Sequence, residues 1–210
     1  MKALPLLIIP LFILSCKGVS QKGQANYKNA KAGFDTELVD HFPKELTVTN
    51  TVYNSYIDEA TNNIGFYLCE YDVDISDIHQ LVNESHRKSI HVYSSDADQL
   101  LIVNRFVTLE KQENDEPPVI DTLLTNNELY EGLYPVPNFL QYRKAARING
   151  TRLPDRFDLY VLEAKNTTRF SARYKLGSNP QMPVKWKNGY SKGVAVNEHE
   201  GTVIYWAITW

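Results

Sequence analysis

The chain has 210 residues, of which 43% are hydrophobic, and a formal net charge of −3. This weakly acidic balance argues against nucleic acid as a partner, because phosphate backbones are bound mainly by basic surfaces. The chain has only two cysteines. A folded part of about 180 residues buries enough surface to be stable without a disulfide.

The amino terminus has the organisation of an export signal. Met1-Lys2 supplies positive charge, and the segment from Leu4 to Leu14 is almost wholly apolar. An apolar run of about eleven residues is too short for a transmembrane helix, which needs roughly 20 residues. It fits the apolar core of a signal peptide.

The motif Ile13-Leu14-Ser15-Cys16 at the end of this run resembles the lipobox of bacterial lipoproteins, with Leu14 bulkier than the usual residue. The resemblance covers residues 1–18 only. It implies that residues 1–15 are a removed signal peptide and that Cys16 carries the palmitate-type lipid anchor. Lys17 stands where inner-membrane retention would use Asp, which implies the outer membrane of a two-membrane bacterium and leaves the leaflet open. The alternative is an ordinary secretory signal with a chance cysteine.

The segment after the cysteine is polar, contains four lysines and shows no apolar periodicity. We expect residues 16–33 to be the lipidated cysteine and a flexible tether. From Phe34 onward the pattern is globular, so residues 34–210 are predicted to form a single domain.

The best helix candidate runs from Asp74 to Lys88. Asp74 can cap its first turn and basic residues close its last turn, as the helix dipole prefers. His79 and His86 lie two turns apart, too far for one metal ion, and are expected to be partly buried structural residues. Cys69, in an apolar run just before this helix, is expected to be a buried apolar residue.

Most other signals predict strands, at residues 89–93, 100–109, 157–164 and 170–176. The clearest is a carboxyl-terminal hairpin, in which residues 194–196 and 202–210 flank a turn that contains His199. Both faces of the last strand are largely apolar, which predicts a central strand covered on both sides. The expected fold is therefore α+β, with a mainly antiparallel sheet, one or a few helices and this hairpin in the sheet.

Charge is divided unevenly along the chain. Residues 34–131 hold 20 acidic and 5 basic side chains, whereas residues 140–192 hold 12 basic and 3 acidic ones. One interpretation is that the two parts fold together and balance locally. The other is a basic face for an anionic envelope component or protein. It would be built from Arg143, Lys144, Arg147, Arg169, Arg173 and Lys175.

Motifs of the familiar catalytic classes are absent from the sequence, so we predict no catalytic residue, no metal site and no cofactor. Trp186, between two lysines, is the aromatic residue expected to be exposed, with ligand stacking as one role and packing as the other. Asp121-Thr122-Leu123 looks like a short O-glycosylation motif, and whether Thr122 is modified stays open.

These features together predict a membrane-anchored lipoprotein whose domain is a non-catalytic binding or scaffolding module. One alternative is an envelope hydrolase with dispersed histidines and carboxylates. Another is an immunity-type lipoprotein that neutralises a toxin.

Overall fold

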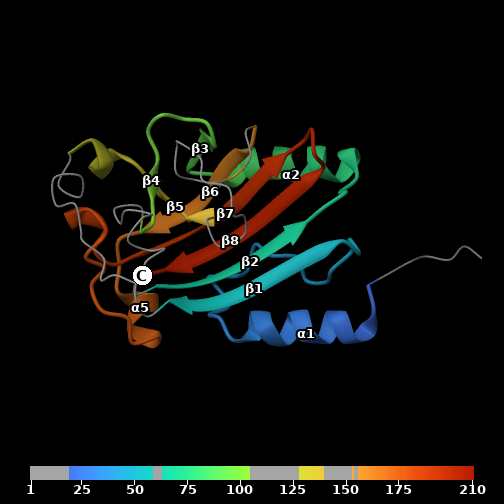
Figure 1. Ribbon diagram of the computed structural model, residues 1–210, viewed down its shortest axis with the longest axis horizontal. Coiled ribbons are helices and arrows are strands. Elements are labelled where there is room, and N and C mark those ends of the chain that lie inside the picture. Colours follow the sequence, from blue (N-terminus) through green and yellow to red (C-terminus); the bar gives the residue numbers. More distant parts are fainter. Residues whose placement is uncertain (1–18, 59–62, 105–127, 140–152, 154–155) are drawn as a thin grey trace, which may run out of the picture.

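The computed structural model describes residues 19–58, 63–104, 128–139, 153 and 156–210, which form an α+β fold (Figure 1). Its main element is an antiparallel six-stranded sheet of order β1-β2-β8-β7-β6-β3, as the sequence predicts. The strands are β1 (Thr51–Asp58), β2 (Asn63–Glu70), β3 (His91–Ser94), β6 (Asp158–Lys165), β7 (Tyr190–Asn197) and β8 (Thr202–Thr209). Two short parallel strands, β4 (Leu101–Ile102) and β5 (Pro135–Val136), pair separately. The helices are α1 (Gln21–Ala32), α2 (Ile75–Lys88) and α5 (Arg169–Arg173), with 3-10 turns η1 (Glu128–Gly132) and η3 (Val184–Trp186).

The predicted carboxyl-terminal hairpin is confirmed and lies at the centre of the sheet. β8 pairs with β2 on one side and with β7 on the other, and all of its residues are buried. Trp206 and its alternate neighbours belong to one core cluster, whereas Tyr205 and its alternate neighbours belong to the other. Because both faces of β8 are apolar, each face of the sheet needs its own covering layer.

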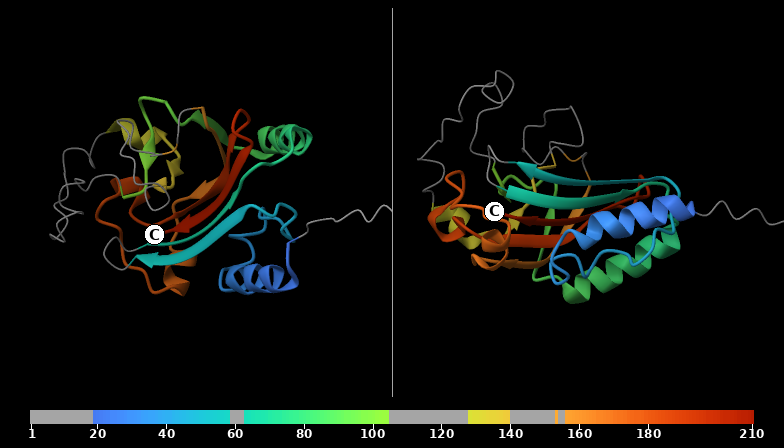
Figure 2. Two further views of the ribbon diagram at one scale, coloured as in Figure 1. Left: turned by 45° about the vertical axis from the view of Figure 1, so that its right-hand side comes forward. Right: turned by 90° about the horizontal axis from the view of Figure 1, so that it is seen from below.

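One face of the sheet is covered by α1 and α2, which lie on the same side in Figure 2. The prediction of α2 is confirmed, with Asp74 as its N-cap. The prediction of a flexible tether is wrong for the residues of α1. Ser20 caps this helix, Tyr27 is fully buried under it, and the Tyr27 hydroxyl donates a 2.7 Å hydrogen bond to the carbonyl of Pro43. The folded domain therefore begins before Phe34. The tether prediction failed because α1 buries a single large side chain and so shows no apolar stripe.

The opposite face is covered by irregular segments around β4, β5 and η3. The predicted strands at 89–93 and 157–164 correspond to β3 and β6. The strand predicted from residue 100 is shorter than expected: β4 has only two residues, and Val103 and Asn104 then form a turn. Residues 105–109 of that prediction lie outside the described residues.

The strand predicted over residues 170–176 is wrong, because this segment forms the one-turn helix α5. Phe170 and Tyr174 are four residues apart, which places them on one side of a helical turn as readily as on one face of a strand. Phe170 packs edge-on against Tyr190, with ring centroids 4.7 Å apart, and Tyr174 accepts a hydrogen bond from the backbone of Asp35. Lys175 then reverses the chain with a φ of 57°.

A glycine in β7 makes room for the largest side chain of β8. A Cβ added at Gly193 would lie 2.4 Å from the Trp206 ring and 2.2 Å from the carbonyl oxygen of Tyr160. Trp206 is fully buried, so its indole cannot move aside into solvent. The absence of a side chain at position 193 therefore lets Trp206 lie flat across the centre of the sheet.

We predict that Gly193→Ala lowers the free energy of unfolding by about 3 kcal/mol or more, because overpacking against both backbone and a buried ring forces the strands apart. Urea unfolding followed by tryptophan fluorescence measures this change. Gly132→Ala is the matched control, since an added Cβ there meets no atom within 4 Å. Equal stabilities of the two variants would contradict this packing.

Candidate functional site

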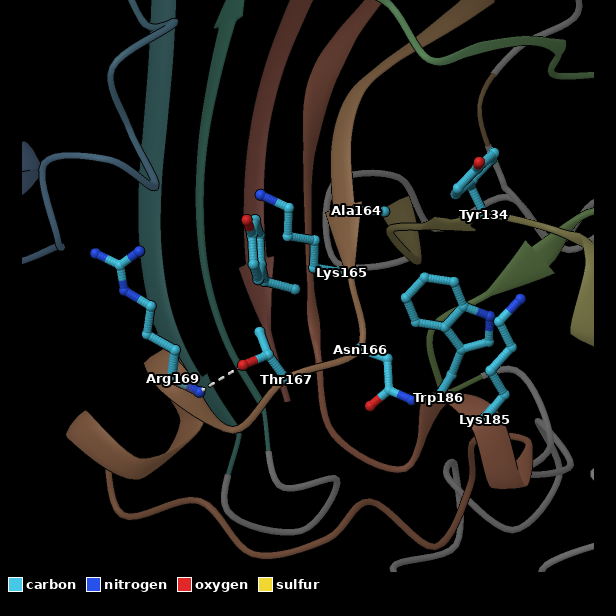
Figure 3. A pocket seen from close by; sticks show the side chains of 9 residues that line it. Tyr134, Ala164, Lys165, Asn166, Thr167, Arg169, Lys185 and Trp186 are labelled. Carbon is cyan, nitrogen blue, oxygen red and sulfur yellow. Dashed lines mark hydrogen bonds between the residues drawn. The ribbon is translucent and has the colours of Figure 1, made fainter.

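The candidate site is an open pocket of about 430 Å³ at the carboxyl end of β6 (Figure 3). Its walls combine basic, aromatic and small polar side chains, and none of the described residues that line it is acidic. The lining residues are Tyr134, Ala164, Lys165, Asn166, Thr167, Arg169, Lys185, Trp186 and Tyr190.

The strand end and the turn that follows form one wall. β6 ends at Lys165, and the hydroxyl of Thr167 accepts a hydrogen bond of 3.2 Å from the backbone nitrogen of Arg169, as the dashed line in Figure 3 shows. This contact turns the chain into α5, where Phe170 packs against Tyr190. Lys165 and Arg169 therefore lie on either side of the turn and both line the pocket.

Trp186 forms part of the facing wall, and its position is fixed by the end of the chain. The Trp210 indole donates a 2.6 Å hydrogen bond to the carbonyl of Trp186, and the two ring centroids are 6.4 Å apart. The ammonium of Lys185 lies 5.6 Å from the centroid of the Trp186 ring. Trp186 is only 3% exposed, so the prediction that it is exposed is wrong. It contributes an edge to the pocket and not an open stacking platform.

The basic side chains of the pocket have acidic neighbours outside its lining. Arg169 pairs with Glu37 at 2.7 Å, and Lys165 pairs with Glu163. Both cations are exposed, and exposed ion pairs of this kind are worth only about 0–1 kcal/mol. A bound anion can therefore replace or share these partners at little cost.

A second pocket, of about 740 Å³, adjoins the first and shares Tyr134, Ala164 and Lys165 with it. Among the strands that the structure describes, β3 is the outer neighbour of β6, and it pairs with residues 158–161 alone. Both pockets lie beside the remaining part of β6. This half of β6 therefore has no strand on its outer side among the strands that the structure describes.

The floor of the second pocket contains a buried lysine. The Lys192 ammonium donates to the carbonyl of Glu37 at 2.6 Å and to Asp40 Oδ1 at 2.9 Å, and it lies 3.3 Å from Glu163 Oε2. A β-bulge in β6 between Val161 and Glu163 brings the Glu163 carboxylate opposite Lys192. The three acceptors compensate the burial of the charge, and they tie the segment after α1 to the sheet.

His41 lies beside this cluster and is also engaged in the fold. Its Nε2 is 2.9 Å from the carbonyl oxygen of Trp206, which can only accept, so this nitrogen carries the proton. Burial lowers the pKa of His41, which favours the neutral ring. The structure thus brings His41, Asp40 and Glu163 together, but each makes contacts that hold the fold.

The histidines chosen from sequence do not form a site. His79 and His86 are exposed rather than partly buried, although the His86 ring contacts Tyr160 edge-on at 5.0 Å. His199 is exposed in the hairpin turn, and Cys69 is buried as predicted. Within the described residues, no group of three or more His, Cys, Asp or Glu is placed to hold a metal ion.

Only part of the predicted basic face can be compared with the structure. Arg169 pairs with Glu37, Arg173 pairs with Asp35 at 2.7 Å, and Lys175 is exposed. The two arginines are therefore neutralised by acidic residues from the first part of the chain, which fits the interpretation of local charge balance. Of the three described residues of the predicted basic face, Arg169 alone lines the pocket. Four predicted positions fall outside the described residues. These are Arg143, Lys144, Arg147 and Thr122, and Cys16, the predicted lipid-anchor residue, also lies outside them.

The sequence reasoning missed several lining residues that come from three separate regions of the chain. These residues are Tyr134, Lys165, Lys185, Tyr190 and Lys192. Only Lys165 had a local signal, because it directly follows the strand predicted at residues 157–164.

Comparisons with known proteins find no significant match to a family model, a curated protein or a solved structure. No helix among the described residues is both long and apolar enough to cross a membrane.

Glu70 is a further buried ionisable group, and it lies away from both pockets. It is 5% exposed, and its Oε1 has no hydrogen-bond partner among the described residues. Burial raises the pKa of Glu70 to about 7. The nearby rings of Tyr27 and Tyr205 belong to the core under the helices, so Glu70 has no route to a substrate in either pocket.

We predict that the contribution of Glu70 to stability falls as pH rises from about 4.5 to above 7, because only the folded state keeps the Glu70 proton in that window. The loss amounts to about 3 kcal/mol by pH 8, and Glu70→Gln removes it. Urea unfolding at pH 5 and pH 8 measures the difference. Glu128→Gln, at an exposed carboxylate, is the control and keeps the pH dependence of the parent. An unchanged slope in Glu70→Gln would refute this assignment.

Proposed function

We propose that this chain is a lipid-anchored lipoprotein of the bacterial cell envelope, held on the outer membrane by Cys16, and that its domain is a non-catalytic binding module. We further propose that the pocket at the end of β6 binds the anionic group of a small ligand. The observation that carries the binding proposal is the pocket wall, where three basic side chains meet aromatic surface without a lining carboxylate.

The chemistry of the wall favours an anion over a neutral ligand. Arg169 can give a carboxylate or phosphate two parallel hydrogen bonds, and lysines add point charges. Lys165 comes from the end of β6 and Lys185 lies beside Trp186 on η3, so the two lysines bring positive charge to the pocket from two separate elements (Figure 3).

The size of the pocket favours a ligand no larger than a monosaccharide or a similar metabolite. Its volume lies at the small end of the range of roughly 300–1,000 Å³ that is usual for ligand sites. An acidic sugar residue of an envelope glycan has both the required charge and this size.

The hydrolase alternative has less support. General acid–base catalysis needs groups within reach of a substrate and free to exchange protons. Asp40 and Glu163 both bind Lys192, and His41 donates to the backbone of Trp206. These groups are committed to holding the segment after α1 against the sheet.

We expect phosphate and galacturonate to bind the domain, and galactose, the neutral counterpart of galacturonate, to bind at least tenfold more weakly. The variant Lys165→Gln/Arg169→Gln/Lys185→Gln should weaken binding of both anions about tenfold, since each of the three exposed charged contacts is worth about 0.5 kcal/mol. Isothermal titration calorimetry measures these affinities.

The matched control is Lys22→Gln/Lys28→Gln/Lys175→Gln, which removes the same charge from exposed positions outside the pocket. We expect less than a twofold change in this variant. Equal binding by the two triple variants, or equal affinity for galactose and galacturonate, would contradict an anion site in this pocket.

A further inference from the structure

The distance between the proposed lipid and the folded domain is short. Val19 packs against the core beneath the helices, and Ser20 caps α1. Only Lys17 and Gly18 separate Val19 from Cys16. Even fully extended, three residue steps span about 11 Å.

Several contacts fix α1 in the fold, so the helix cannot act as an extension of the link. Gln24 exchanges two hydrogen bonds with the backbone of Leu46, at 2.6 and 3.0 Å. The Lys31 ammonium donates to the carbonyls of Phe42 and Pro43, both at 3.1 Å. With Tyr27 fully buried, both ends of the helix are held to the segment that follows it.

We propose that the end of the domain that carries the N-terminus of α1 lies against the bilayer, and that the anion pocket faces the aqueous phase. The proposal rests on the lipid anchor of the proposed function. Its occupant is the phospholipid surface into which the acyl chains of Cys16 insert. The short chain between the lipidated residue and the first packed residue keeps this end of the domain close to the bilayer.

The two ends of the domain are well separated. The N-terminus of α1 and the turn between β7 and β8 lie at one end of the long axis, whereas α5 and the carboxyl terminus lie at the other (Figure 1). At the first end, Val73 donates a 3.0 Å hydrogen bond to the carbonyl of Gly201, and Asn50 donates to Asp72 at 2.9 Å. These loops and the start of α1 form the surface that we place next to the lipid; we name it the anchor end.

The charge of the anchor end indicates that the covalent link, and not electrostatic attraction, sets the orientation. Its exposed side chains include Asp72, Asp74, Glu198 and Glu200, and the exposed Lys22 at the start of α1 offsets only one of these negative charges. Anionic head groups repel such carboxylates within a Debye length of about 8 Å. The domain without lipid is therefore expected not to bind anionic vesicles.

Fluorescence quenching by head-group nitroxide lipids in phosphatidylethanolamine–phosphatidylglycerol vesicles tests the orientation of the full lipidated protein. A fluorophore is attached to His199→Cys at the anchor end or to Ser178→Cys near the pocket end, both exposed positions. Cys69 is buried and Cys16 is acylated, so labelling is confined to the introduced thiol. We expect quenching to be at least threefold stronger at position 199 than at position 178.

A matched variant carries a 20-residue Gly-Ser insert between Gly18 and Val19, which adds a coil of about 25 Å root-mean-square length. This insert should reduce the difference between the two positions to less than 1.5-fold. Equal quenching at both positions in the parent protein, or stronger quenching at position 178, would overturn the orientation. Protein that stays in solution, with no acyl mass on Cys16, would instead refute the lipid anchor itself and the orientation with it.

Discussion

The structure depends on the burial of β8 on both of its faces. A strand with Tyr205 on one side and Trp206 on the other cannot be stable at the surface of a two-layer protein, so the sheet needs cover above and below. The helices supply one cover, and irregular segments around β4, β5 and η3 supply the other. The two pockets lie beside the half of β6 that β3 does not pair with.

The sequence predicted the elements whose buried residues recur at one regular spacing, every second residue in a strand or every three to four residues in a helix. The alternation in β8 and the apolar stripe and cap of α2 are examples, and both were found where expected. It failed where few side chains carry the packing. α1 buries only Tyr27, and the spacing of Phe170 and Tyr174 fits a helical turn as well as a strand.

The candidate site was harder to predict than the fold, because its residues meet only through tertiary packing. Lys192 receives Asp40 from a segment more than 150 positions earlier in the chain, and a bulge in β6 turns Glu163 towards it. Neither event leaves a local pattern. Trp186 lines the pocket, but the exposure predicted for it is wrong, because it packs against Trp210, which directly follows β8 and donates a hydrogen bond to its carbonyl.

The packing of α1 connects the fold to the proposed anchoring, because it makes the chain between lipid and domain short. Hydrogen–deuterium exchange of the mature protein tests this packing most directly. The account predicts that the backbone amides of α1 from Ala25 to Ala32 are protected by at least about 3 kcal/mol, in common with β2 and β8. Exchange of these amides at the rate of an unfolded peptide, while the sheet stays protected, would contradict the packing of α1. It would instead support the flexible tether that the sequence predicts for this segment.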